Sequence, residues 1–201
     1  MPRPGPSTTP VQRHRLSTTS VVDAAIELID EMGPGVLTLA AVARRTGVAT
    51  PSLYKHVDSG EALQQKVSAR VTGELANILT DAIAGRSGEE AVRSLAHAYR
   101  DYARSHPGRY PLTQRVPDVR DPEHLAASER AVRAVFAALS GFGLAGDDAI
   151  DATRMARSAL HGFVSLEIDH GFGLPQDVGH SFSCLVSALN VSLRNWREVA
   201  R

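Results

Sequence analysis

Apolar residues recur at steps of three and four along most of this chain, and this spacing restricts the possible fold more than any other feature of the sequence. The longest such row consists of Leu63, Val67, Val71, Leu75, Ile78 and Ile83. A row of this kind covers one face of a helix, and that face is stable only when it packs against other helices. No segment alternates apolar and polar residues as a half-buried strand would. The sequence therefore predicts an all-α protein.

Glycine, proline and capping residues divide the chain into individual helices. Ser17 or Ser20 can cap the first helix, and two pairs, Ser20 with Asp23 and Ser87 with Glu90, match the capping-box pattern at helix starts. The proline-rich stretch 107–122 is expected to form short turns and loops. The predicted helices begin after residue 16 and near residues 38, 50, 63, 88, 123, 147 and 176.

Three regions follow from this division. Residues 1–15 contain four prolines and few apolar residues, so they are expected to form a flexible arm. Residues 16–62 are predicted to form a small three-helix unit. Residues 63–201 are predicted to form a helical bundle, with the long helix over 63–83 as the joint between the two.

The segment 38–57, "TLAAVARRTGVATPSLYKHV", reads as two short helices joined at a glycine. Thr38 can cap the first helix, and Gly47 suits the left-handed conformation that follows a helix end. Thr50 can cap the second helix, with Pro51 in its first turn, where a missing N–H costs nothing. Together these signals predict a helix-turn-helix motif.

The outward face of the second short helix has a composition suited to DNA. On a helical wheel, Leu53 and Val57 point inward, while the polar and aromatic residues lie outside. Lys55 supplies positive charge, and Tyr54 and the hydroxyls can donate hydrogen bonds to phosphate oxygens. The helix N-terminus favours an anion, and Thr50 or Ser52 could reach base edges in the major groove. An ordinary solvated helix and a purely structural helix hairpin remain open as alternatives.

The stretch "SVVDAAIELIDEMGPGVLTLAAVARRTGVATPSLYKHVDSGEAL" resembles the N-terminal domain of the TetR family of transcriptional regulators. The matching features are the Gly-rich turn, the "LT" before the second helix, the "A-x-x-x-G-V" across the turn and the "S-L-Y-x-H-V" that follows it. Downstream, "HPGRY" (106–110) and "ALHGFVSLE" (159–167) are similar to segments of one class of C-terminal domains in that family.

This resemblance implies a homodimer that places one recognition helix per subunit in the major groove of a double-stranded DNA operator. Arg44 and Arg45 end the preceding helix, where positive charge favours the negative end of the helix dipole. At least one of the two could also contact phosphate, and Arg45 is the one assigned to DNA contact. The other residues assigned to DNA contact are Thr38, Thr50, Pro51, Ser52, Tyr54, Lys55 and His56. Ala40 and Gly60 stand where some family members carry a base-reading arginine and a phosphate-binding lysine. A helical small-molecule-binding protein with a weakened DNA-binding head is therefore the alternative.

The resemblance also implies an effector pocket in the region 63–201, whose occupation releases the protein from DNA, as in a repressor. Because the bundle is mainly apolar, a largely apolar small molecule is expected. His161, beside Gly162, also fits a hydrogen-bonded core histidine at a close helix contact. The candidate lining residues are His97, Tyr99, Tyr102, Arg154, His161 and Phe163.

No feature of the sequence points to an enzyme, a cofactor or a metal. Glu167 and His170 have Glu-x-x-His spacing, but a di-iron bundle needs two such motifs and two further glutamates. Phosphate-binding glycine loops and hydrolase or zinc-protease motifs are absent from the sequence. The formal net charge is zero, so DNA binding must rest on a local surface. The single cysteine and the lack of a membrane-length apolar run predict a cytoplasmic protein without a membrane partner.

Overall fold

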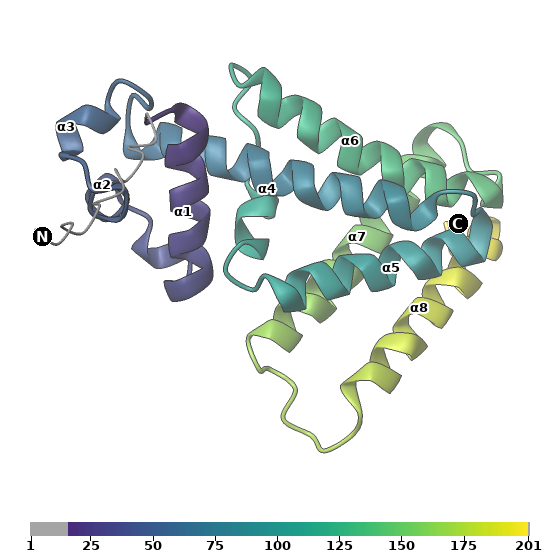
Figure 1. Ribbon diagram of the computed structural model, residues 1–201. Coiled ribbons are helices and arrows are strands. Elements are labelled where there is room, and N and C mark those ends of the chain that lie inside the picture. The colour runs from purple at the N-terminus through teal and green to yellow at the C-terminus, as the bar shows by residue number, and fades with distance from the viewer. Residues whose placement is uncertain (1–15, 201) are drawn as a thin grey trace, which may run out of the picture.

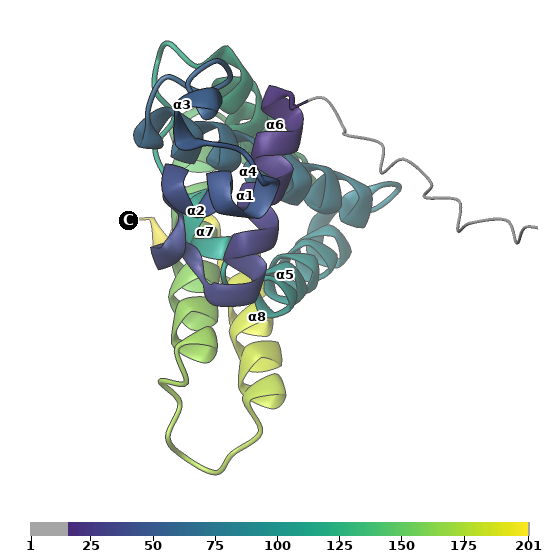
Figure 2. The same ribbon diagram turned by 60° about the vertical axis from the view of Figure 1, so that its left-hand side comes forward.

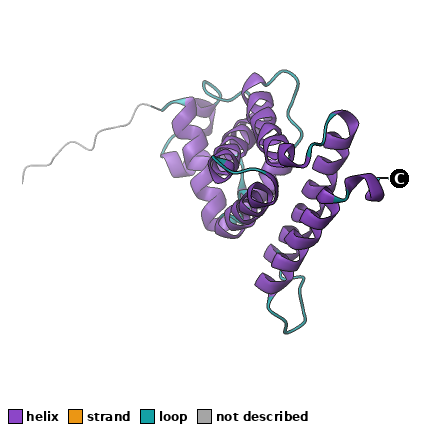
Figure 3. Ribbon diagram, turned by 90° about the vertical axis from the view of Figure 1, so that its right-hand side faces the viewer, coloured by secondary structure: helices purple, strands orange, loops and turns teal. Residues whose placement is uncertain are grey.

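The computed structural model describes residues 16–200, and within this range every regular element is a helix (Figure 3). The predicted all-α class is confirmed, while the predicted arm 1–15 lies outside the described residues. The elements are α1 (Thr18–Met32), η1 (Pro34–Val36), α2 (Leu39–Thr46), α3 (Thr50–Leu53), α4 (Gly60–Ile83), α5 (Gly88–Ser105), η2 (Tyr110–Gln114), α6 (Pro122–Leu139), η3 (Ser140–Phe142), α7 (Gly146–Ile168), α8 (Val178–Arg194) and α9 (Trp196–Val199).

Helices α1, α2 and α3 form a small head at one end of the molecule, and α4 leads from this head into the bundle (Figure 1). The head has its own apolar core, in which Ile29 of α1 and Val42 of α2 are fully buried. Residues of α4 up to Val71 belong to this core, while Leu75 and Leu79 belong to the core of the bundle. A single continuous helix therefore joins the two units.

Helices α4 to α8 form the bundle, with α4 packed along both α5 and α6. Helices α7 and α8 run in opposite directions and are joined by a loop that extends away from the body (Figure 2). Fully buried aromatic side chains, Tyr110 of η2 and Phe182 of α8, contribute to this second core. None of the helices within residues 16–200 is both long and apolar enough to cross a membrane.

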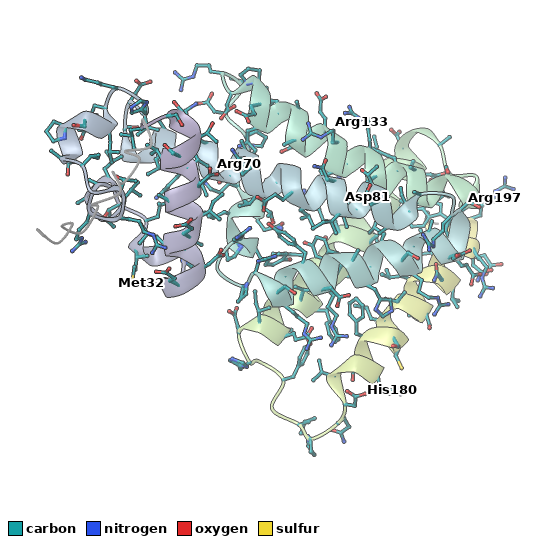
Figure 4. The ribbon with its side chains drawn as sticks, viewed as in Figure 1. Met32, Arg70, Asp81, Arg133, His180 and Arg197 are labelled. Atoms are coloured by element: carbon teal, nitrogen blue, oxygen red, sulfur yellow. The ribbon has the colours of Figure 1, made fainter. Side chains whose placement is uncertain are left out.

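Both predicted capping boxes are wrong. Helix α1 begins after residue 16 as predicted, and of the two candidate caps Ser17 is the one used: it accepts a 3.1 Å hydrogen bond from the backbone N–H of Ser20. Asp23 instead pairs with Arg70 of α4 at 3.0 Å, across the junction of head and bundle (Figure 4). Ser87 makes no side-chain capping bond at the start of α5, and Glu90 pairs with Arg86 at 3.2 Å. In both segments the carboxylate that the pattern assigned to a cap, Asp23 or Glu90, forms an ion pair with an arginine instead.

Candidate DNA-binding surface and ligand cavity

The turn between α2 and α3 is built by local interactions. The Oγ1 of Thr38 accepts a 3.1 Å hydrogen bond from the N–H of Ala41, which caps α2 as the sequence predicts. Gly47 then adopts the left-handed conformation with φ 69°, a region that side chains other than glycine rarely enter. The N–H of Val48 donates to the carbonyl of Ala43 at 3.0 Å and closes the turn. These bonds fix the direction in which α3 leaves α2.

Helix α3 is shorter and begins earlier than the sequence suggests. Thr50 is its first residue rather than its cap, and Ala49, at the cap position, makes no side-chain hydrogen bond. Pro51 lies in the first turn as predicted. With only four residues, α3 is about one turn long, so the helix dipole adds little to anion binding there. Any affinity of this surface for phosphate must come from its side chains.

The residues around α3 divide cleanly into an inner and an outer set. Leu53 and Val57 are buried in the head core, which confirms the predicted inward face. Lys55 is exposed, and Tyr54 leaves 54% of its surface accessible. Thr50, Ser52 and His56 are partly exposed. No acidic residue occurs between 38 and 57, so this segment itself offers a cation, a phenol and hydroxyls and no carboxylate, and the exposed Asp58 follows it directly.

The start of α1 is tied to this surface. The hydroxyl of Thr18 donates to the backbone carbonyl of His56 at 3.3 Å, linking residues 38 positions apart. This bond holds the turn after α3 against the first turn of α1. The N-terminal end of the described chain therefore lies beside the predicted DNA surface.

Arg45, unlike Lys55, is held in ion pairs. Its guanidinium donates to Glu27 at 2.9 Å and to Glu31 at 2.7 Å, and both glutamates belong to α1. Two carboxylates around one guanidinium leave no positive charge to attract phosphate, which argues against the assignment of Arg45 to DNA. Arg44 is exposed and has no ion pair within residues 16–200. Of the two arginines, Arg44 is the one available to a ligand.

A cavity of about 370 Å³ lies in the bundle, which is within the size range of small-molecule sites. It is lined by residues of α4, α5, α6 and α7 and by the segment 113–117, and it is partly open to solvent. Tyr99 and Arg154, two of the six predicted lining residues, lie on its wall. Thr72, Thr113, Gln114, Arg115 and Arg157 also line it and were not predicted; only Arg157, one helical turn after Arg154, could have been found from its spacing.

The other four predicted lining residues lie elsewhere in the bundle. Tyr102 is buried, and its hydroxyl donates to the carbonyl of Val71 at 3.2 Å. His97 and Phe163 pack against the ring of Phe182, with centroid distances of 5.4 and 5.2 Å. His161 makes a 2.6 Å hydrogen bond through Nδ1 to the hydroxyl of Tyr110. All four side chains thus make packing or hydrogen-bond contacts inside the bundle, and His161 is the hydrogen-bonded histidine that the sequence also allowed, although a Cβ on Gly162 would meet nothing within 4 Å.

A hydrogen-bonded chain of side chains leads away from the cavity. The hydroxyls of Tyr99 and Tyr110 lie 2.7 Å apart, and Tyr110 continues to His161. Burial raises the pKa of Tyr99, and burial together with the neighbouring Tyr99 raises the pKa of Tyr110 further. Both phenols therefore keep their protons near neutral pH. The chain connects α5, η2 and α7 behind the cavity wall.

The Glu-x-x-His pair is arranged as an ion pair and a helix end rather than as a metal site. Arg100 donates to both carboxylate oxygens of Glu167, at 2.7 and 2.6 Å. His170 lies past the end of α7 in a left-handed conformation with φ 56°. Among residues 16–200, no three His, Cys, Asp or Glu side chains lie together in a way that could hold a metal ion.

Comparison with known proteins places these features in a family. Residues 21–66 match the model of the tetR family of bacterial regulatory proteins, and residues 92–189 match that of the tetracyclin repressor-like C-terminal domain. The HTH-type transcriptional regulator Rv0681 of Mycobacterium tuberculosis is 43% identical over 83% of this chain and 78% of its own length. YobS of Bacillus subtilis, also an HTH-type transcriptional regulator, is 35% identical over 84% of this chain and 87% of its own length.

Solved structures agree on the fold. A TetR protein from Acinetobacter baumannii AYE, crystallised in complex with minocycline, superposes with a TM-score of 0.70. It is 20% identical in sequence, and the superposition covers 91% of this chain and 99% of the other. The family match to the head covers α1 from residue 21 onward, the whole helix-turn-helix and the start of α4. From its head, its bundle and its relatives, this chain is a member of the TetR family of helix-turn-helix transcriptional regulators.

Proposed function

We propose that the protein is a homodimeric repressor that binds a double-stranded DNA operator through α3 and the turn after it, and that a small molecule in the bundle cavity releases it. The observation that carries the DNA part is the outer surface of residues 50–56. Lys55 and Tyr54 are exposed there, while Leu53 anchors the same short segment in the head core. A segment fixed in this way can enter a major groove without rearranging.

The roles within this surface follow from chemistry. Lys55 and the hydroxyl of Tyr54 would contact phosphate, together with the hydroxyl of Thr38 at the start of α2. The bases would be faced by Thr50, Ser52 and His56, with the exposed Pro51 beside them. Arg44 replaces Arg45 as the expected phosphate contact, because Glu27 and Glu31 occupy Arg45. With one lysine and no arginine pointing to base edges, part of the operator would be read through DNA shape.

A face formed by α7 and α8 is the proposed dimer interface. Leu166 of α7 and Val191 of α8 leave 51% and 48% of their surfaces exposed, and Ile150 leaves 40%. Small residues, including Ser187 and Ala188, lie exposed along α8. A second copy covering these two helices would bury the apolar side chains and set the distance between two heads. A monomer at micromolar concentration would contradict this part of the proposal.

The segment 108–115 provides a route from the cavity to the head. At one end, Gly108 and Arg109 touch α1, and Leu112 belongs to the head core. At the other end, Gln114 and Arg115 line the cavity. A ligand that moves this segment would therefore move α1 relative to the bundle. The two heads of a dimer would then no longer match the spacing of two half-sites.

The TetR protein from Acinetobacter baumannii was crystallised with minocycline, a small molecule, and supports a ligand-responsive role for the shared fold. Its sequence is too distant to specify the ligand of this chain. The effector of this chain is proposed to have a largely apolar body, because leucine, valine and alanine side chains make up much of the cavity wall.

The second candidate function is a small-molecule-binding protein whose head no longer selects DNA. Ala40 and Gly60 motivate it, because neither residue has a side chain that can donate a hydrogen bond to a base or a phosphate. Quantitative binding to DNA from beside the protein's own gene, compared with random DNA of equal length, separates the two functions. The repressor account expects a clear preference for one fragment and affinity that falls steeply with salt. Equal binding to every genomic fragment and to random DNA would leave only the second function.

A further inference from the structure

The cavity wall is apolar over most of its area but carries a distinct basic end. Leu75, Leu79, Leu95, Val135 and Leu160 supply the apolar wall. Arg115, Arg154 and Arg157 also line the cavity, and no aspartate or glutamate of the described range 16–200 does. A cavity whose charged lining residues are all basic favours an anionic ligand.

Two of the three arginines keep their charge available. Arg154 pairs with Asp151 at 3.2 Å and is largely exposed, so its charge is partly neutralised. Arg157 donates only to the neutral side-chain oxygen of Gln114, at 3.2 Å. Arg115 forms no ion pair within residues 16–200. Arg115 and Arg157 therefore define the basic end of the cavity.

Unsatisfied polar atoms gather around the same space. The hydroxyls of Thr72 and Thr153 and the Nε of Arg115 are buried, yet none of them has a hydrogen-bond partner. All three residues line the cavity, and Thr72 is 96% buried, with 4% of its surface accessible. Buried polar groups in native proteins are nearly always paired. These unpaired donors belong to residues of the cavity wall and favour a ligand with acceptor atoms over a purely apolar one.

We propose that the effector is an organic carboxylate with an apolar body. Its carboxylate lies at Arg115 and Arg157, where guanidinium groups can donate charge-assisted hydrogen bonds. Its body fills the space along Leu75, Leu79 and Val135. This inference rests on the proposed ligand-responsive function and adds to it the charge and polarity of the ligand.

Matched probes test the charge of the ligand directly. The carboxylates are dodecanoate and 1-naphthaleneacetate. The neutral partners are 1-dodecanol and 1-naphthaleneethanol, and the cationic partners are dodecylamine and 1-naphthaleneethylamine. Isothermal titration of the full chain should give at least one carboxylate roughly tenfold to a hundredfold tighter binding than its alcohol. The corresponding amine should bind more weakly than the alcohol, because the basic end repels it.

Variants locate the carboxylate within the protein. Arg157→Gln and Arg115→Gln should each remove most of the preference for the carboxylate over the alcohol. Arg115→Lys keeps the charge and should retain part of the preference, which protects the test if Arg115→Gln fails to fold. Arg133→Gln is the matched control, because Arg133 lies on the exposed side of α6 and pairs only with Glu129 (Figure 4). It should leave the preference unchanged.

The inference is wrong if neither carboxylate binds more tightly than its alcohol, or if the preference survives in both glutamine variants. These titrations contain no DNA. Failure of the repressor proposal would instead appear as a lack of operator binding by the unliganded protein, so the two failures are distinguishable.

Discussion

The Nε of Arg109 lies 2.7 Å from the Oδ1 of Asp30, which joins the segment before η2 to α1 across 79 positions of sequence. The same guanidinium donates to Glu74 of α4 at 3.1 Å. One side chain therefore holds the head, the long connecting helix and the segment that leads to the cavity. Arg109 lowers the pKa of Asp30, first through the hydrogen bond and then through its charge.

Replacing Arg109 should loosen this junction. Arg109→Gln leaves two partly buried carboxylates without their cation, so we expect a loss of about 1–3 kcal/mol in the free energy of unfolding. Arg70→Gln is the control, because the Arg70–Asp23 pair also joins α4 to α1 but is more exposed. Exposed pairs are typically worth less than about 1 kcal/mol. Urea unfolding measures both free energies. Equal losses in the two variants would contradict a larger contribution of Arg109 to the stability of the junction.

Gly108 permits the close approach on which this junction depends. A Cβ built on Gly108 would lie 2.6 Å from the backbone carbonyl oxygen of Ile29, which cannot move independently of α1. Gly108→Ala should therefore cost about 1–3 kcal/mol through steric overlap. Gly35→Ala meets nothing within 4 Å and serves as the control. Thermal unfolding of the two variants should give a lower Tm for the first only; an unchanged Tm for Gly108→Ala would contradict the tight contact.

His124 makes stability sensitive to mild acid. Its side chain is fully buried at the start of α6, and its Nδ1 lies 3.2 Å from Oε1 of Gln65. Burial lowers the pKa of His124 below its usual 6.5, aided by the charge of Arg115 and opposed by Asp121. The unfolded chain therefore binds a proton at a higher pH than the folded chain does. Stability should fall as the pH drops below about 6.5.

The measurement for His124 compares unfolding free energies between about pH 7.5 and pH 5 in the native protein and in His124→Leu. The native protein should lose stability more steeply over this window, because its unfolded state binds a proton at His124 and the leucine variant cannot. All other residues are the same in both proteins, so the difference between the two profiles isolates position 124. Parallel pH profiles would mean that His124 is not held neutral by burial.

The two neighbouring arginines of α2 should differ in their effects on DNA binding. Arg44→Ala should weaken operator binding and reduce the salt slope, because an exposed, unpaired cation is lost. Arg45→Ala should leave the salt slope nearly unchanged, because Glu27 and Glu31 already neutralise that charge. Fluorescence anisotropy over a range of salt concentrations measures both slopes. A larger loss of slope in Arg45→Ala would restore Arg45 as the phosphate contact.

The sequence was informative where structure is local. Helical periodicity placed Leu53 and Val57 in the head core, and the residues of the α2–α3 turn fixed Thr38 as a cap and Gly47 as the left-handed residue. These features depend on contacts within a few positions of the chain. The start of α3 was harder to predict, because Thr50 can be either the cap or the first residue of a helix with Pro51 in its first turn.

Long-range partners could not be read in the same way. The pairing of Arg45 with Glu27 and Glu31 spans 18 and 14 positions and depends on how α2 crosses α1. The cavity wall includes Gln114 and Arg115, which lie in a proline-rich segment without periodicity. Arg157 follows Arg154 by one helical turn and could have been found from that spacing.

The salt dependence of operator binding by the native protein and by Lys55→Ala tests the central claim most directly. Lys55 is exposed on the α3 surface and lies in a stretch without acidic residues. We expect the native protein to bind one fragment beside its own gene in preference to random DNA. We expect Lys55→Ala to bind every sequence more weakly, with a log–log salt slope shallower by about one phosphate contact. An unchanged affinity and slope in Lys55→Ala would contradict the assignment of this surface to DNA.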